Sequence, residues 1–113
     1  MNDLHGRLKN FAVAVYKLTL KFRKDSLLNA NIDQLIRSSA SPGANYGEAQ
    51  SASSTKDFNN KIRISLKEMR ETNYWLEYFN QILPETKELA KLIDESEQLC
   101  KILSAIAFKT RAK

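Results

Sequence analysis

The side chains that could support chemistry in this chain are three glutamates, one cysteine and one histidine. Glu48 lies in the second of four helical segments, and Glu68 and Glu71 lie in the third. Helical bundles build carboxylate-bridged metal sites from such residues, but those sites take Glu-x-x-His pairs, and no helical segment here has one. We therefore predict no metal site and interpret the three glutamates as charge partners of Arg37 and of neighbouring lysines.

A nucleophilic site would have to use Cys100 and His5, the only residues of their types. Cys100 sits among apolar residues, whereas His5 lies in an N-terminus that we predict to be frayed, so the two should not meet. There is no glycine-rich phosphate loop and no Ser/His/Asp set. We predict a protein that is not an enzyme and uses no cofactor. The lone cysteine excludes a disulfide framework and fits a reducing compartment, so we predict a cytoplasmic location.

Length and composition predict one domain with an ordinary core, because the chain has 113 residues. No apolar run approaches the roughly 18 residues of a membrane span, and the N-terminus lacks a signal pattern, so we expect no membrane partner. The net charge is +5, and the first 25 residues hold six Lys or Arg against two acids. This charge allows weak attraction to nucleic acid, although solubility alone explains it equally well.

Apolar residues recur at alternating spacings of three and four, the pattern of amphipathic helices that pack at coiled-coil-like angles. In the third segment this spacing runs unbroken from Thr55 to Leu83 and stops before Pro84. No stretch alternates with period two, so strands are excluded. We predict an all-α, antiparallel up-down-up-down four-helix bundle over residues 1–113. The predicted helices span about 4–24, 26–50, 55–83 and 85–109.

The second helix is the uncertain element, because helix signals and helix breakers overlap around Pro42. A proline in a helix interior removes one hydrogen bond and costs about 3 kcal/mol. Local rules favour a stop at Ser41, and the alternative is a helix that continues through a kink near residue 42. Small residues in this segment would let a neighbouring backbone approach closely. On the continuous helix Arg37, Ser41, Asn45 and Glu48 share one polar face.

The second and third helices should form an antiparallel hairpin that turns near Ala52 and Ser53. Residues that face each other then have numbers that add to about 105. This register predicts three pairs: Arg37 with Glu68, Gln34 with Glu71, and Asn45 with Asn60. We treat Arg37, Asn45, Glu48, Glu68 and Glu71 as structural polar pairs. For a buried pair, loss of one member would cost about 3 to 5 kcal/mol.

Four aromatic residues, Tyr74, Trp75, Tyr78 and Phe79, occupy nearly every face of one helical turn. They are too many for a single core row, so some must point outward. An exposed aromatic side chain beside apolar neighbours more often marks a subunit interface than a base-stacking surface. We predict an oligomer interface at Tyr74, Trp75 and Tyr78, with stacking on nucleic acid as the alternative.

Basic residues should gather at the two ends of the bundle, because the first and fourth helices run in opposite directions. One predicted cluster holds Arg7, Lys9, Lys109, Arg111 and Lys113. The other holds Lys17, Lys21, Arg23 and Lys24, which could equally serve to match the macrodipole at the end of the first helix. We predict sequence-tolerant binding of an RNA or DNA backbone. The alternative is a scaffold that recognises a protein partner through the same residues.

Several segments resemble a known bacterial family of four-helix bundle proteins, first noticed as products of intervening sequences in large-subunit ribosomal RNA genes. The segments are RSSAS at 37–41, ANYGEA at 44–49, KDF at 56–58, KE at 67–68 and YWLE at 74–77, and the resemblance covers about residues 4–108. It implies a left-handed bundle, a continuous second helix and a ring-like homopentamer. It also relates the chain to accessory proteins of diversity-generating retroelements, similar pentamers that bind nucleic acid and a reverse transcriptase.

The chain departs from the family pattern at two positions of the second helix. Family members usually carry an aliphatic residue at the position of Pro42, and often another at that of Gly47. Both substitutions weaken a helix. The resemblance therefore overrules the local preference for a break at Ser41, but it predicts a looser segment after it.

Overall fold

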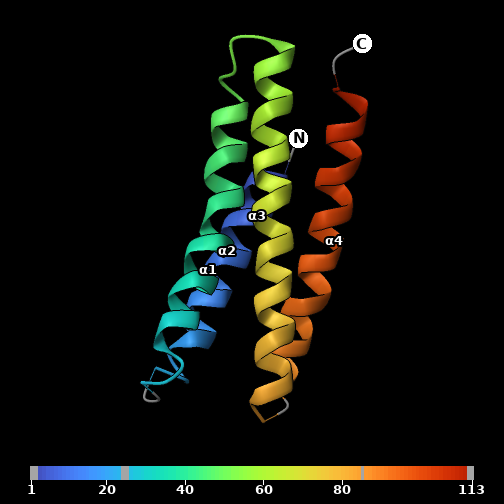
Figure 1. The fold of residues 1–113 in the computed structure, drawn as a ribbon. Helices are drawn as coiled ribbons and strands as arrows, with labels where there is room; N and C mark the ends of the chain where they lie inside the picture. Colours follow the sequence, from blue (N-terminus) through green and yellow to red (C-terminus); the bar gives the residue numbers. More distant parts are fainter. Residues whose placement is uncertain (1–2, 24–25, 85, 112–113) are drawn as a thin grey trace.

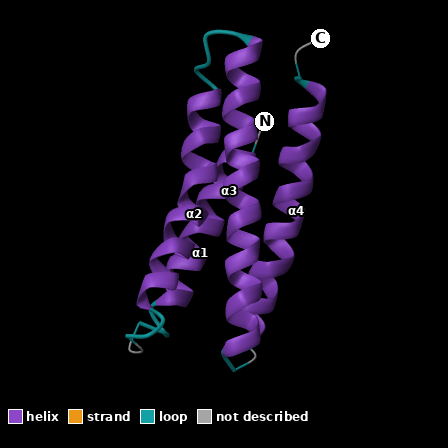
Figure 2. Cartoon of the chain, viewed as in Figure 1, coloured by secondary structure: helices purple, strands orange, loops and turns teal. Residues whose placement is uncertain are grey.

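Four helices carry most of the chain in the computed structural model, which describes residues 3–23, 26–84 and 86–111. They are α1 (Leu4–Thr19), α2 (Asn29–Ala49), α3 (Thr55–Ile82) and α4 (Lys87–Lys109). Successive helices pack side by side in opposite directions, and α4 returns against α1 (Figure 1 and Figure 2). The predicted all-α antiparallel four-helix bundle is confirmed, whereas its left-handed twist stays a prediction.

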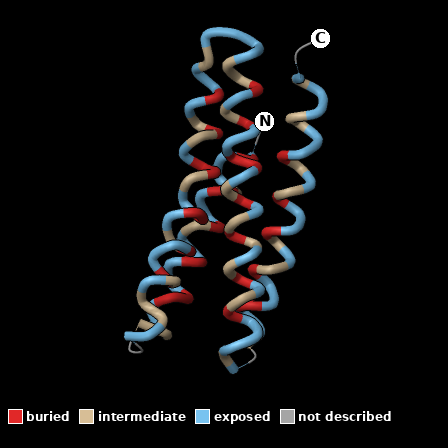
Figure 3. The backbone as a smooth tube through the Cα atoms, viewed as in Figure 1, coloured by how far each residue is buried: buried red, intermediate tan, exposed pale blue. Residues whose placement is uncertain are grey.

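The core consists of one buried row from each helix, visible as the red segments that face the inside of the bundle in Figure 3. The rows follow the predicted spacing of three and four, and full burial of one such side chain contributes about 1.5 to 3 kcal/mol. Their largest members include Leu8 and Val15 of α1, Ile32 and Leu35 of α2, Ile62, Met69 and Leu76 of α3, and Leu89, Leu99 and Leu103 of α4. Among the described helices, none is both long and apolar enough to cross a membrane.

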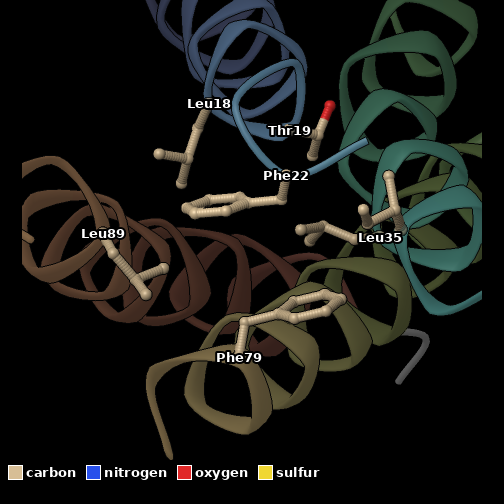
Figure 4. A pocket seen from close by; sticks show the side chains of 7 residues that line it. Leu18, Thr19, Phe22, Leu35, Phe79 and Leu89 are labelled. Atoms are coloured by element: carbon tan, nitrogen blue, oxygen red, sulfur yellow. The ribbon is translucent and has the colours of Figure 1, made fainter. Parts of the chain in front are cut away.

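The first helix ends at Thr19, so the prediction that it reaches residue 24 is wrong. Beyond it, the amide of Phe22 donates to the carbonyl of Thr19 at 3.0 Å, a tighter turn than that of an α-helix. This turn brings the Phe22 ring back over the end of the core, between Leu18 and Leu35 (Figure 4). The space left there is about 10 Å³, room for about one water molecule at most. This end of the bundle is therefore packed core and not a ligand cavity.

The first residues of α2, α3 and α4 lie within three residues of the predicted starts, and a side-chain cap fixes two of them. α2 begins at Asn29 instead of residue 26, and no side chain caps it. α3 begins at Thr55 as predicted, because the Ser54 hydroxyl accepts a hydrogen bond from the Asp57 amide. α4 begins two residues later than predicted, since Thr86 acts as its N-cap.

α2 continues through Pro42 to Ala49, so the break that local rules favour at Ser41 is wrong. Two side chains donate hydrogen bonds to carbonyl groups next to the proline. The Ser65 hydroxyl of α3 donates to the Pro42 carbonyl at 2.9 Å, and the Asn45 amide, within α2, donates to the Ser41 carbonyl at 3.0 Å. The carbonyl that loses its amide donor to Pro42 is that of Ser38, so these bonds support the segment without replacing the missing one. The continuous helix is what the family resemblance implied. A kink near residue 42 stays a prediction.

Candidate nucleic-acid interface

The predicted cluster of basic residues from the two chain ends does not form, because α1 is too short. α1 has 16 residues and α4 has 23, and α1 starts part-way along the bundle (Figure 1). Arg7 of α1 meets Glu95 in the middle of α4. From Glu95 to Lys109 the helix rises about 20 Å at 1.5 Å per residue. The prediction that Arg7 and Lys9 lie near Lys109 and Arg111 is therefore wrong.

Two residues predicted to bind nucleic acid, Arg7 of α1 and Lys21 just after it, are held by carboxylates of α4. The Arg7 guanidinium donates to both carboxylate oxygens of Glu95, at 2.7 and 2.8 Å, and these hydrogen bonds raise the pKa of Arg7. Lys21 forms an ion pair with Glu88 and lowers the pKa of that carboxyl group. A phosphate group would have to compete with these carboxylates, so both residues are weaker candidates than the sequence indicated.

The other residues predicted to bind nucleic acid differ in whether a neighbouring side chain already contacts their charged group. Arg23 pairs with Asp33 at 2.6 Å, and the guanidinium of Arg111 lies 3.7 Å from the centre of the Phe108 ring. Three candidates are exposed and form no ion pair with any described residue: Lys9, Lys17 and Lys109. Two candidates lie outside the described residues: Lys24 and Lys113.

The outer side of α3 carries a row of cations that the sequence analysis did not single out. We define this basic face by Lys56, Arg63, Lys67 and Arg70, which are all exposed. Their spacings of seven, four and three place them on one side of the helix, opposite the core row. None of the four forms an ion pair with a described residue. The signal was present in the sequence, since the polar positions of α3 repeat with the same period as its apolar ones.

A groove of about 370 Å³ lies beside the basic face, between α3 and α4. Its lining includes Arg70 and Asn73 of α3 and Glu97, Cys100 and Lys101 of α4. Cys100 is half-buried, and burial raises the pKa of its thiol, which keeps it protonated at neutral pH. Cys100 packs against the core among apolar residues, as its sequence neighbours predicted, and the raised pKa agrees with an unreactive thiol. Two cations therefore flank a concave surface next to the row on α3.

The four aromatic residues of α3 divide between core and surface. Phe79 is buried, whereas Tyr74 keeps 60% of its surface exposed. Trp75 and Tyr78 are half-buried, and the Tyr78 hydroxyl accepts a hydrogen bond from Asn31 at 3.1 Å. The predicted division into inward and outward rings is confirmed. The assignment of Tyr74, Trp75 and Tyr78 to a subunit interface stays a prediction.

A second exposed apolar surface lies on α1, and the sequence analysis missed it. Val13, Tyr16 and Leu20 are about half exposed and follow one another at spacings of three and four. Beside them, a groove of about 230 Å³ between α1 and α2 is lined in part by Ala40 and Ala44. An apolar ridge next to a groove of small residues is a further candidate contact between copies of the chain.

Arg37 is held by two glutamates of α3, as the polar face of α2 predicted. It donates to Glu68 at 2.8 Å and to Glu71 at 2.5 Å, and these hydrogen bonds raise its pKa. The Arg37 side chain is 51% exposed and that of Glu68 is 12% exposed. The predicted Arg37–Glu68 pair is confirmed, but it lies at the surface. The cost of about 3 to 5 kcal/mol for a broken buried pair therefore does not apply.

The other two predicted pairs between α2 and α3 are wrong. Glu71 is bound by Arg37 instead of Gln34, and the Asn45 amide bonds within its own helix to Ser41 instead of reaching Asn60. Two other contacts between α2 and α3, one buried and one at the surface, show why. The Thr72 hydroxyl donates to that of Ser38 at 2.9 Å, and Lys61 pairs with Glu48 at 3.1 Å. In both pairs, the residue of α3 lies about one turn further along the helix than the register predicted. The Arg37–Glu68 pair still forms because both side chains are long enough to span this shift.

The glutamates and the histidine form no catalytic or metal site among the described residues. Glu68 and Glu71 bind Arg37, Glu48 binds Lys61, and no group of three or more ligand side chains could hold a metal ion in the described part. His5 lies in the first turn of α1 with its ring 6.1 Å from that of Tyr46, so the prediction of a frayed position is wrong. It lines the groove between α1 and α2, whereas Cys100 lines the groove between α3 and α4.

Replacement of Arg37 by alanine is expected to lower the free energy of unfolding by about 1 kcal/mol. The reason is that the half-exposed Arg37 holds two carboxylates, and solvent reduces the strength of each contact. Urea denaturation followed by circular dichroism measures the change. Arg63→Ala, at an exposed arginine that pairs with no carboxylate of residues 3–23, 26–84 or 86–111, is the control and should change the free energy of unfolding by less than about 0.5 kcal/mol. Equal effects of the two substitutions would contradict a stabilising role for the Arg37 contacts.

Comparison with known proteins identifies a protein family and a solved structure with a similar fold. The family model described as "23S rRNA-intervening sequence protein" matches residues 4–105. No curated protein sequence matches the chain. The crystal structure of a protein of unknown function from the S23 ribosomal protein family of Bacteroides thetaiotaomicron is similar, with 33% identity and a TM-score of 0.83. That match covers 91% of this chain and 96% of the other, so the similarity extends over nearly the whole bundle.

Proposed function

Because the chain belongs to the family of 23S rRNA-intervening sequence proteins, we propose that it acts without catalysis, as a self-associating helical bundle that binds the backbone of RNA or DNA. The observation that carries the proposal is the basic face of α3, where four exposed cations have no carboxylate partner among the described residues. Phosphate groups bind such cations with release of counterions, and this binding does not depend on base sequence. The lone cysteine fits a reducing compartment, so we propose a cytoplasmic location.

The non-catalytic part of the proposal is supported by the state of the groups that could react. The Cys100 thiol has a raised pKa because of burial, so little thiolate is present at neutral pH. The three glutamates first considered for chemistry are engaged by Arg37 and Lys61. Their carboxylates form ion pairs that link α2 to α3.

Self-association would raise the affinity for nucleic acid, which the modest net charge of one chain alone would leave weak. We propose a homo-oligomer, with five subunits as the number that the family resemblance implies. Copies in a ring would repeat the basic face around the assembly. Contacts from several copies to one strand raise the affinity well above that of one chain, because the later contacts are intramolecular. The exposed ridge of Val13, Tyr16 and Leu20 and the aromatic residues of α3 are the two candidate interfaces.

The proposal is tested with the full chain and fluorescently labelled RNA and DNA strands of mixed sequence, by anisotropy across a series of salt concentrations. We expect log affinity to fall linearly with log salt, by about 0.7 per phosphate contact on single strands. The double substitution Arg63→Gln with Lys67→Gln should reduce this slope by about 1.4, since it removes two contacts. Lys9→Gln with Lys17→Gln, which changes the net charge equally, should reduce it less.

Two results would contradict this assignment at different levels. Salt-insensitive or undetectable binding by the unaltered protein at low ionic strength would remove the nucleic-acid function. A larger loss in the Lys9 and Lys17 variant would keep the function but place it on α1. A pull-down with and without nuclease separates the alternative role. A protein partner such as a reverse transcriptase that stays bound after nuclease treatment would support a protein scaffold instead.

A further inference from the structure

An exposed tyrosine continues the basic face of α3. Tyr74 follows Arg70 by four residues, so it lies one turn further along the same side of the helix. Its ring is stacked on that of Tyr78, with centroids 6.4 Å apart and planes at 25°, and the Trp75 ring meets it edge-on at 5.2 Å. These contacts hold the Tyr74 ring in place, while 60% of the residue remains exposed. A fixed aromatic ring thus stands directly after a row of cations.

The cations and the ring repeat along the helix at a pitch that suits an extended strand. Arg63, Lys67, Arg70 and Tyr74 follow one another with rises of about 6, 4.5 and 6 Å. Beside Arg70, a groove of about 370 Å³ lies between α3 and α4. Glu97 is the acidic group in that groove, and both Arg70 and Lys101 line the same space. A strand bound along the row would therefore pass this concave surface at Arg70 and reach Tyr74 one turn further along α3.

We infer that this face binds single-stranded rather than duplex nucleic acid, with Tyr74 stacking on an unpaired base while Arg63, Lys67 and Arg70 contact the backbone. The inference rests on the proposed function and adds the kind of strand and the stacking residue. Proteins that bind single strands combine a basic path with aromatic rings in this way, because every base offers a face for stacking. The bases of a duplex are already stacked inside it, so Tyr74 gains nothing there.

The surroundings of Tyr74 favour stacking over burial in a contact between two copies of this face. The buried centre of a protein interface is depleted of charged residues. Here Arg70 lies one turn before Tyr74, and Lys67 lies one turn before that, both exposed. Two copies of the face placed against each other would bring these like charges together. A polyanion meets no such repulsion.

The test compares single-stranded and duplex DNA of the same mixed sequence with the full chain at one low salt concentration. Tyr74→Ala should weaken single-strand binding about tenfold, and duplex binding by less than threefold. Tyr74→Phe keeps the ring and should retain single-strand affinity within about threefold. Phe108→Ala, at an exposed aromatic residue of α4, is the control and should change neither affinity. The fluorescence of Trp75, the single tryptophan, should change on addition of single strands, because its ring touches that of Tyr74.

The outcomes separate this inference from the proposed function. If Tyr74→Ala leaves single-strand affinity unchanged while Arg63→Gln with Lys67→Gln lowers the salt slope, the stacking inference is overturned and backbone binding stands. Equal losses on single strands and duplex would also overturn it. So would a lower oligomer mass of Tyr74→Ala by light scattering, since the ring would then belong to a subunit interface. Binding that does not respond to salt in the unaltered protein would remove the proposed function itself.

Discussion

Replacement of Leu76 by alanine is expected to lower the free energy of unfolding by about 3 kcal/mol, within the range measured for large-to-small core substitutions. Leu76 lies on the inner side of α3 with no exposed surface. The substitution removes apolar contacts with the other helices and leaves a cavity that the close-packed core fills only in part. Thermal denaturation should show a fall in Tm of more than about 10 °C for a chain of this size.

Glu77 supplies the control for Leu76, because it is the next residue and points to solvent. Glu77→Ala should change the free energy of unfolding by less than about 0.5 kcal/mol, as usual for surface positions. A similar effect of the two substitutions would mean that α3 is rotated relative to the described core. Both variants are compared at the same protein concentration, because the proposed self-association would make the measured stability depend on concentration.

Replacement of Gly43 by leucine is expected to give a protein about 2 kcal/mol less stable than replacement by alanine. Gly43 is buried where α2 crosses α1, and a Cβ atom built there would lie 3.5 Å from the Cβ of Leu8. That distance is an ordinary contact, so alanine fits. The next atoms of a leucine side chain would meet the backbone of Leu8 and Lys9, since these atoms already lie 3.8 Å from the Cβ position. Overpacking of this kind costs about 1 to 3 kcal/mol.

The alanine variant is itself informative, because its expected change has the opposite sign. Glycine in a helix interior is about 1 kcal/mol less favourable than alanine. Gly43 has no positive φ angle that would favour glycine. Gly43→Ala should therefore raise the free energy of unfolding by up to about 1 kcal/mol, measured by urea denaturation. A loss of stability in the alanine variant would show that α1 and α2 lie closer together than the described distance to Leu8.

The candidate binding surface changes how the charge of this protein is understood. The sequence places much of the positive excess in the first 25 residues. In the folded chain, Arg7, Lys21 and Arg23 of that stretch are paired with carboxylates, whereas the cations of the basic face of α3 pair with no carboxylate in the part of the chain that the structure describes. The distribution of charge along the sequence therefore pointed to the first helix, whereas a row of exposed cations without carboxylate partners among the described residues lies on α3. Ion pairs formed by residues far apart in the chain decide which charges remain available.

The periodicity of the sequence predicted most of the fold because it records which side of each helix is buried. The core rows of all four helices and the start of α3 followed from spacing and capping alone. The Arg37–Glu68 contact also followed, since a short turn limits the register and long side chains tolerate a shift of one turn. The short asparagine side chains do not tolerate it, so the predicted Asn45–Asn60 pair was wrong.

The sequence by itself determined the four amphipathic helices, their antiparallel order and the outward row of cations on α3, because these depend on residue spacing within one helix. Local helix rules did not determine the continuation of α2 through Pro42; the family resemblance implied it, and in the tertiary structure Ser65 of α3 bonds to the proline carbonyl. The tertiary structure alone decided that Arg7 meets Glu95, and so lies far from Lys109. Both contacts depend on the alignment of neighbouring helices along the bundle, which no local pattern encodes.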